Sequence, residues 1–181
     1  MRVIAGEFRS RILKEVESDK TRETKDRVKE SVFNSLVPYL VDANVLDLFA
    51  GSGALGIEAL SRGSKHATFV DLSLDAYNVI KHNIDNLELK KQSLIFNRNY
   101  NTHLYKTEEK YDVILLDPPY DLVVLDDCIK MIQESRLLTK NGIIVCLYSK
   151  NSSLKEDSNG IIEYKQKKIG VTKVSFMKWG I

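Results

Sequence analysis

The sequence has few of the residues that would build a metal site or a disulfide. Cys128 and Cys146 are its two cysteines, 18 positions apart in apolar surroundings, and they form no CxxC pair. Structural zinc sites and redox motifs use closely spaced pairs, so two reduced thiols in the core are expected. The histidines have no metal-ligand spacing either, and we expect them on the surface or on a helix face: His66, His82 and His103. No metal is therefore expected.

Long apolar runs are also absent. A helix that spans a bilayer needs about 20 consecutive apolar residues, and no segment approaches this although 43% of the residues are hydrophobic. The opening residues, MRVIAGEFR, are charged too early and too often for a secretory signal. We therefore expect a cytoplasmic protein and no membrane partner.

Charge of one sign does not dominate, since the formal net charge is only +2. Basic residues are nevertheless unevenly distributed. Residues 20–29 contain five basic and two acidic side chains, and residues 150–181 contain seven lysines and three acids. Such patches can contact phosphates, but runs of charge more often form a solvated face. Both interpretations stay open on charge alone.

Hydrophobic periodicity alternates between strand and helix over most of the chain. Apolar runs typical of buried strands lie at 45–49, 67–71, 93–96, 111–116 and 142–147. Helical spacing occurs at 25–36, 54–62, 74–84 and 122–135. Pro38 is expected to end the first helix. The first 20 or so residues indicate a short strand pair or an extended arm, and residues 161–168 and 171–177 an antiparallel pair.

Such repeated strand–helix units predict an α/β fold with a mostly parallel sheet, covered by helices on both faces, and an antiparallel hairpin at its C-terminal edge. We expect one domain over residues 1–181, with a basic arm at 1–23, a helix at 24–38 and a catalytic core at 44–181. Ligands bind such sheets at the carboxyl ends of the strands, near the point where the strand order reverses. The functional residues should therefore follow the strands.

A glycine-rich loop follows the first core strand. Gly51, Gly53 and Gly56 form GxGxxG between a strand and a helix, and Asp71 ends the next strand. This is the dinucleotide fingerprint, but it suits S-adenosylmethionine equally well, because that cofactor also needs a close backbone approach and a carboxylate on its ribose. Asp47 favours the methyl donor, since a carboxylate beside the loop suits a cationic ligand rather than a pyrophosphate.

Further cofactor-binding candidates surround this loop. Phe49 and Ser52 complete a pattern, D-x-F-x-G-x-G, that resembles the loop of class I methyltransferases. Asp71 is the candidate for the ribose hydroxyls, and Leu72 beside it is included in the site; Ser73 is the expected helix cap. The candidates for the adenine follow the third strand: Asn99 and Tyr100.

The tetrapeptide Asp117-Pro118-Pro119-Tyr120 follows the buried strand at 111–116. Two prolines fix two φ angles and remove two N–H donors, so the carbonyl of Pro118 is held just beyond the strand. An exocyclic amine can donate its hydrogens to that carbonyl and to Asp117, while the base stacks on Tyr120. This arrangement directs the nitrogen lone pair toward a methyl group and stabilises the positive charge that develops. A turn that merely ends the strand is the alternative.

Taken together, these segments resemble the RsmD family of bacterial 16S rRNA guanine-N2 methyltransferases nearly from end to end. The segments that carry the resemblance are RVIAG at 2–6, the basic run at 22–36, DLFAGSGALGIEALSRG at 47–63, DPPY at 117–120 and GVT at 170–172. The resemblance implies a class I, Rossmann-like methyltransferase with a seven-stranded sheet, S-adenosylmethionine as cofactor, and the N2 amine of one specific guanine as target. Glu23, Ser10 and Lys29 depart from the family pattern, as does the pair Asp71-Leu72.

The expected partner is 16S rRNA or the small ribosomal subunit, bound by a monomer. The candidates for holding RNA phosphates are Arg2, Arg9, Arg11, Arg22, Lys25 and Arg27. Three other classes stay in view. A DNA adenine-N6 methyltransferase usually carries an extra target-recognition segment, an NAD-dependent oxidoreductase needs a proton-transfer residue, and a non-catalytic RNA-binding protein would be expected to have lost Asp117 or the glycines.

Overall fold

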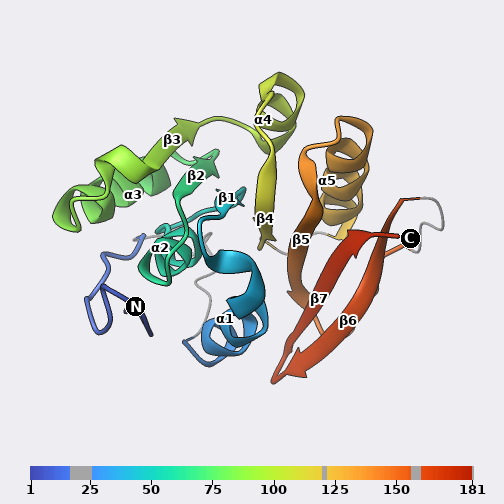
Figure 1. The fold of residues 1–181 in the computed structure, drawn as a ribbon, viewed down its shortest axis with the longest axis horizontal. Coiled ribbons are helices and arrows are strands. Elements are labelled where there is room, and N and C mark those ends of the chain that lie inside the picture. Colours follow the sequence, from blue (N-terminus) through green and yellow to red (C-terminus); the bar gives the residue numbers. More distant parts are fainter. Residues whose placement is uncertain (17–25, 120–121, 156–159, 181) are drawn as a thin grey trace.

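The computed structural model describes residues 1–16, 26–119, 122–155 and 160–180. Within them, seven strands form one sheet in the order β3-β2-β1-β4-β5-β7-β6 (Figure 1). The strands are β1 Asn44–Asp47, β2 His66–Asp71, β3 Ser93–Asn97, β4 Tyr111–Leu116, β5 Leu138–Ser149, β6 Ile161–Ile169 and β7 Thr172–Trp179. β1 to β5 run parallel, whereas β7 is antiparallel to β5 and to β6. The predicted architecture is confirmed, and the strand order reverses between β1 and β4.

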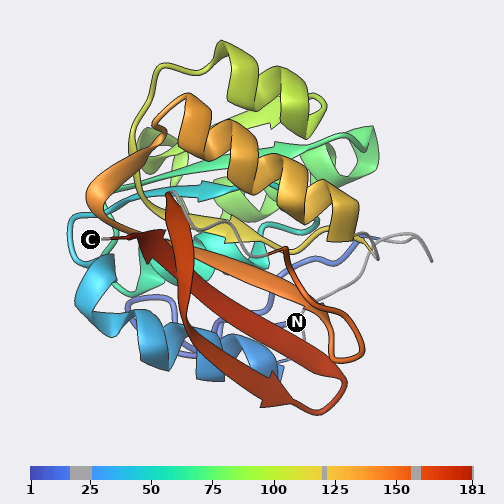
Figure 2. The same ribbon diagram turned by 90° about the vertical axis from the view of Figure 1, so that its right-hand side faces the viewer.

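The helices divide between the two faces of this sheet, as Figures 1 and 2 show. They are α1 Asp26–Leu40, α2 Ala54–Ser61, α3 Leu74–Asn86, α4 Tyr100–Lys106 and α5 Leu122–Glu134. α1, α2 and α3 bury their apolar sides in one core layer, and α4 and α5 in a second layer on the opposite face. In α1, for example, Val28, Val32 and Leu36 repeat every four residues and are all buried.

The end of α1 corrects one sequence prediction, because the helix continues through Pro38 to Leu40. Proline removes one backbone donor, and its ring crowds the carbonyl four residues earlier, which together cost about 3 kcal/mol inside a helix. Packing beyond Pro38 offsets that loss. Leu40 is buried, and its carbonyl accepts a hydrogen bond of 3.0 Å from Ser64 Oγ.

Two further elements differ from the prediction. α4 was not predicted, because its seven residues, capped by Asn99, are too few to produce a helical period. β5 begins at Leu138 rather than at Gly142. Its pairing with β4 shifts register between Tyr111 and Val113, so polar residues 139–141 belong to a strand that no apolar run indicates.

The N-terminal segment, residues 1–16, folds back on itself through one antiparallel bridge, Arg2 to Ile12. Its apolar side chains Val3 and Leu13 are buried in the core layer beneath α1, α2 and α3. The predicted strand pair is therefore reduced to a single bridge, and the segment forms part of the core. Among the described residues, no helix is both long and apolar enough to cross a bilayer.

Candidate active site

The glycine loop and the segment that starts at Asp117 leave the sheet side by side. β1 and β4 are parallel neighbours, with Asp47 in register with Leu115, and the Leu48 N–H donates to the Leu115 carbonyl at 3.2 Å. Neighbouring strands lie about 4.8 Å apart. Both segments therefore begin at the same carboxyl edge, at the point where the strand order reverses and where such sheets bind ligands.

The glycines of the loop have different physical roles. Gly51 and Gly53 have φ angles of 56° and 82°, a backbone conformation that disfavours residues with a Cβ. A Cβ on Gly51 would meet no atom within 4 Å, whereas a Cβ on Gly56 would lie 2.3 Å from Phe69 Cε1. Gly56 thus allows α2 to pack against β2, and Gly51 leaves open space at the carboxyl edge.

Two carboxylates accept hydrogen bonds from backbone N–H groups of the glycine loop and of the helix that follows it. Asp47 is buried, and its Oδ2 accepts the Gly56 N–H at 2.9 Å. Asp71 accepts the Gly51 N–H on Oδ2 and the Ser73 N–H on Oδ1, both at 2.8 Å. Ser73 caps α3, as predicted. Negative charge therefore lies beneath and beside the loop, which suits a cationic ligand with hydroxyl groups.

Asn97, at the end of β3, is a site residue that sequence reasoning missed. Its Nδ2 donates to the carbonyls of Asp71 and Leu72, at 3.2 and 2.9 Å. These bonds fix the turn that presents Asp71, and the side chain of Leu72 is left 69% exposed at the rim. The only signal in the sequence was an amide at a strand end, which is a weak one.

Asn83 of α3 is the second residue that the sequence did not indicate. It is buried, and its Nδ2 donates to the carbonyl of Ser52 at 2.9 Å and to that of Lys14 at 3.0 Å. Its Oδ1 accepts the Lys14 N–H at 2.8 Å. One amide therefore ties the buried Ser52 of the glycine loop to the N-terminal segment.

The aromatic residues predicted near the loop do come together. The rings of Phe49 and Tyr100 have centroids 5.6 Å apart, and the Tyr100 hydroxyl donates to Asp127 Oδ2 of α5 at 2.9 Å. Asn99 caps α4 through its Oδ1, which accepts the Asn101 N–H at 3.3 Å. Its side-chain oxygen thus caps the helix, a role that the sequence did not predict for Asn99.

The segment after β4 follows directly from a strand that is buried except at Asp112. Asp117 is 8% exposed, Pro118 is buried and Pro119 is exposed. Tyr120 lies outside the described residues. A carboxylate and a rigid carbonyl therefore stand at the end of the strand next to the glycine loop, where they can accept hydrogen bonds from an amine.

Neither the cysteines nor the histidines add reactive groups to this edge. Burial raises the pKa of the Cys128 and Cys146 thiols, which keeps them protonated. His103 is buried on α4, where desolvation lowers its pKa to about 4. In the part of the chain that the structure describes, no cluster of three or more His, Cys, Asp or Glu residues is suited to hold a metal ion.

Two of the arginines predicted to bind RNA, Arg9 and Arg11, belong to the N-terminal segment. The Glu7 N–H donates to Ser61, the last residue of α2, and the Arg11 guanidinium donates to the carbonyl of Asn86, the last residue of α3. Since α2 has eight residues, this places the Arg9 turn about 12 Å from the glycine loop.

Two other predicted RNA contacts, Arg2 and Arg27, lie at the start of α1. Arg2 pairs with Asp26 at 3.4 Å, and Arg27 is exposed next to it. Arg22 and Lys25 lie outside the described residues. Lys29, which belongs to the same basic run, is fully buried instead.

Comparisons with known proteins bear on this geometry. The family model described as "Conserved hypothetical protein 95" matches residues 1–178. The chain belongs to this family. Among its relatives is the Ribosomal RNA small subunit methyltransferase D of Haemophilus influenzae, which is 36% identical over 177 residues and covers 91% of this chain and 92% of its own length. The resemblance to the RsmD family is thereby confirmed.

Solved structures of similar proteins share the fold of this family member. The yhhF protein of Escherichia coli has a TM-score of 0.89 and 28% identity, and the match covers 99% of this chain and 97% of that one. SMU.776, solved in complex with SAH, has a TM-score of 0.66 and 15% identity, with 83% and 49% of the two chains covered. The chain thus has the Rossmann-like methyltransferase fold that the sequence predicted.

Proposed function

We propose that this protein transfers a methyl group from S-adenosylmethionine to the exocyclic N2 amine of a guanine in 16S rRNA. One observation carries the proposal: Asp117 and the glycine loop leave adjacent parallel strands at the same edge of the sheet. A small cofactor held by one can therefore reach an amine held by the other. The relatives named as small-subunit rRNA methyltransferases support the choice of substrate.

The residues around the glycine loop fit S-adenosylmethionine. The open space above Gly51 accepts a ligand at backbone distance, and the free lone pairs of the Asp71 carboxylate can accept ribose hydroxyls. Asp47 supplies negative charge beneath a cationic ligand, and Leu72 and the Phe49–Tyr100 pair offer apolar surface to an adenine. When bound, the cofactor supplies an electrophilic methyl group on a sulfonium.

Asp117 and Pro118 would orient the target amine. The carboxylate accepts one N–H and the Pro118 carbonyl the other, so the nitrogen lone pair points out of the base plane toward the methyl. The negative charge of Asp117 would stabilise the positive charge that develops on the amine nitrogen during methyl transfer. The amine proton then becomes acidic, and Asp117 receives it or passes it to water.

The guanine must leave its stack or lie in a loop to reach a recessed strand end. Phosphates elsewhere in the bound RNA would contact the predicted basic residues of the N-terminal region, Arg2, Arg9, Arg11, Arg22, Lys25 and Arg27. Since the Arg9 turn lies about one α2 length, roughly 12 Å, from the glycine loop, Arg9 would bind RNA some distance from the target. A substrate of this kind puts the enzyme in the cytoplasm, where ribosomes are assembled.

The test is methyl transfer itself. Labelled S-adenosylmethionine is incubated with the protein and with unmodified 16S rRNA, assembled small subunits or DNA, and the product nucleoside is identified by mass. We expect N2-methylguanine from one of the RNA substrates. N6-methyladenine in DNA would contradict the proposal and would favour the DNA methyltransferase alternative.

A substitution then links the reaction to the proposed residue. Asp117→Ala should lower the methylation rate by two or more orders of magnitude, since it removes an acceptor aimed at the reacting amine. Binding of S-adenosylhomocysteine, measured by calorimetry, should stay nearly unchanged. Turnover that survives the substitution would rule out this role for Asp117.

A further inference from the structure

The C-terminal strands extend past the end of β4 on the side where Asp117 lies. Leu116 is in register with Cys146 of β5, and β5 continues three residues further, to Ser149. At about 3.3 Å per residue, β5 reaches roughly 10 Å beyond the last residue of β4. Ser149 pairs with Thr172 at the start of β7, so the turn between β6 and β7 also stands at this edge.

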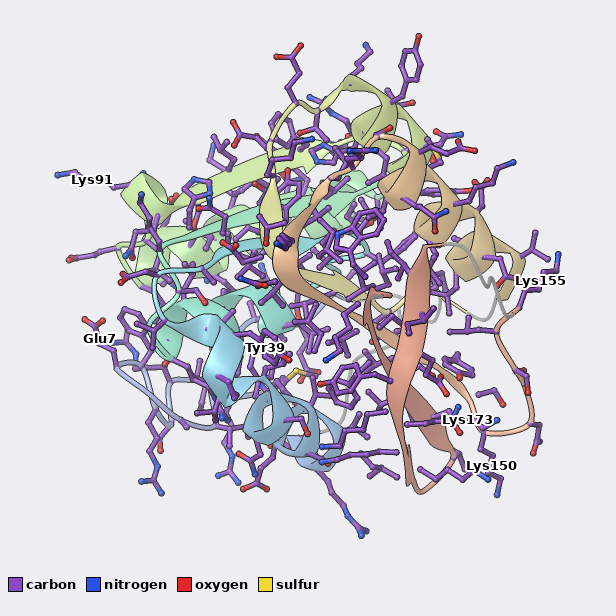
Figure 3. All side chains as sticks on the ribbon, turned by 45° about the vertical axis from the view of Figure 1, so that its right-hand side comes forward. Glu7, Tyr39, Lys91, Lys150, Lys155 and Lys173 are labelled. Carbon is purple, nitrogen blue, oxygen red and sulfur yellow. The ribbon has the colours of Figure 1, made fainter. Side chains whose placement is uncertain are left out.

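Three lysines gather at this projecting end, and we call them the rim lysines: Lys150, Lys168 and Lys173. The Lys150 N–H donates to the Val171 carbonyl at 3.0 Å, which fixes it to the hairpin turn. Figure 3 shows Lys150 and Lys173 at the same end of the hairpin. Lys173 Nζ donates to the Ser152 carbonyl at 2.7 Å and lies over the Tyr148 ring.

The arrangement of these lysines is unfavourable for the free protein. Lys168 and Lys173 are directly opposite one another on β6 and β7, and like charges in such cross-strand pairs are destabilising. No carboxylate among the described residues forms an ion pair with any rim lysine. A bound polyanion would supply the missing negative charge.

We propose that the rim lysines bind the RNA phosphate backbone beside the target nucleotide. The inference rests on the proposed function and adds an RNA contact surface to it. The segment that starts at Asp117 lies between this surface and the glycine loop. RNA is the occupant that the charges favour, because the proposed target base must approach this same edge and brings its phosphates with it. The N-terminal arginines then hold more distant parts of the substrate.

The test compares two neutralised lysines with a matched control. The double variant Lys150→Gln/Lys168→Gln leaves Lys173, with its structural bond, in place. Lys91→Gln is the control, because the short helix Lys90–Gln92 precedes β3 and so lies at the opposite edge of the sheet. Figure 3 shows Lys91 on the far side of the molecule from Lys150. Binding of an unmodified 16S rRNA transcript is measured between 50 and 200 mM KCl.

We expect the double variant to bind at least roughly tenfold more weakly near 0.1 M salt, with a salt slope smaller by about 1.4 to 1.8, because each of the two lost phosphate contacts accounts for about 0.7 to 0.9 of the slope. Lys91→Gln should leave both values unchanged. S-adenosylhomocysteine affinity should be unaffected in either protein. Relief of the cross-strand repulsion should also raise the melting temperature of the free Lys168→Gln variant by about 1 °C.

The outcomes separate this inference from the function beneath it. If the wild type methylates 16S rRNA but the double variant matches Lys91→Gln in affinity and slope, the surface is wrong and the function stands. If the double variant loses affinity as expected while no guanine is methylated by the wild type, the surface is supported and the proposed reaction fails.

Discussion

The two faces of the sheet are stabilised by different means. On the face of α1, α2 and α3, the carboxylate of Glu58 lies fully buried at a meeting point of several elements. It accepts the backbone N–H groups of Ile4 and Ala5 at 2.9 and 3.1 Å, and it pairs with Arg62 Nε at 2.8 Å and Lys29 Nζ at 3.5 Å. The N-terminal segment, α1 and α2 are joined through this single side chain.

The face of α4 and α5 lacks such a center among the described residues. Its buried polar contacts join uncharged side chains, such as Tyr148 Oη with Ser175 Oγ at 2.6 Å, and the bond of Tyr100 to Asp127 is exposed. His103 Nδ1 is buried there without a hydrogen-bond partner. Buried ion pairs therefore stabilise the face that contains α2, the helix that follows the glycine loop. In contrast, α4 and α5, on the face beside the segment that starts at Asp117, depend mainly on apolar packing.

Removing Glu58, on the face of α1, α2 and α3, should cause the largest loss of stability. Glu58→Ala leaves the buried Lys29 without its counter-charge and leaves two backbone donors unsatisfied, so we expect a loss of about 3–5 kcal/mol in the free energy of unfolding. Chemical denaturation provides the measurement. Glu134→Ala is the control, since its pair with Lys130 is exposed and should contribute less than about 0.5 kcal/mol. Equal effects of the two changes would show that the buried contacts of Glu58 stabilise the protein no more than an exposed ion pair does.

On the face of α4 and α5, low pH should destabilise the protein through protonation of His103. Burial lowers its pKa to about 4 in the folded protein, against about 6.5 when unfolded. The unfolded state therefore binds the proton more tightly. Stability from the neutral ring is fully present above pH 6.5 and is lost as the pH falls to 4, by up to about 3 kcal/mol.

His103→Leu should flatten this part of the pH profile. Stability measured at half-unit steps for both proteins gives the difference directly, because the carboxylates titrate alike in each. A difference that stays constant from pH 7 to pH 4 would show that the ring of His103 does not titrate in this range.

The glycine loop allows scaffold and ligand effects to be separated. Gly56→Ala forces a methyl group against Phe69, so it should cost about 1–3 kcal/mol of stability. Gly51→Ala meets no atom and should cost only about 1–2 kcal/mol through its positive φ. The Gly51 variant should nevertheless bind S-adenosylhomocysteine at least tenfold more weakly, as calorimetry would detect. Unchanged affinity would exclude the cofactor from the space above Gly51.

The smallest expected effect is at Asn83. Asn83→Asp keeps the acceptor for the Lys14 N–H but removes the donor to the carbonyls of Ser52 and Lys14, so S-adenosylhomocysteine affinity should fall severalfold. Asn86→Ala, one turn along the exposed side of α3, should not change it. Equal affinities in the two variants would mean that the loop needs no support from α3.

The sequence predicted those parts of the protein whose structure depends on residues close together in the chain. Glycines at 51, 53 and 56 and the prolines after Asp117 determine local backbone geometry, so their strand-end positions followed from the pattern. Glu58 and Asn83 gave no comparable signal, because their bonds reach residues 53 to 69 positions away. Lys29 belongs to a basic run, and only the packing of α1 on α2 determined that its charge is buried.

The N-terminal segment also has a consequence for biosynthesis. Residues 1–16 are translated before their partners, so Ile4 must wait for Glu58, and Lys14 for Asn83. Val3 and Leu13 therefore remain without their native core until nearly half of the chain has been made. During translation, residues 1–16 therefore reach their native contacts late. Until then, a chaperone that binds short apolar segments could bind Val3 and Leu13.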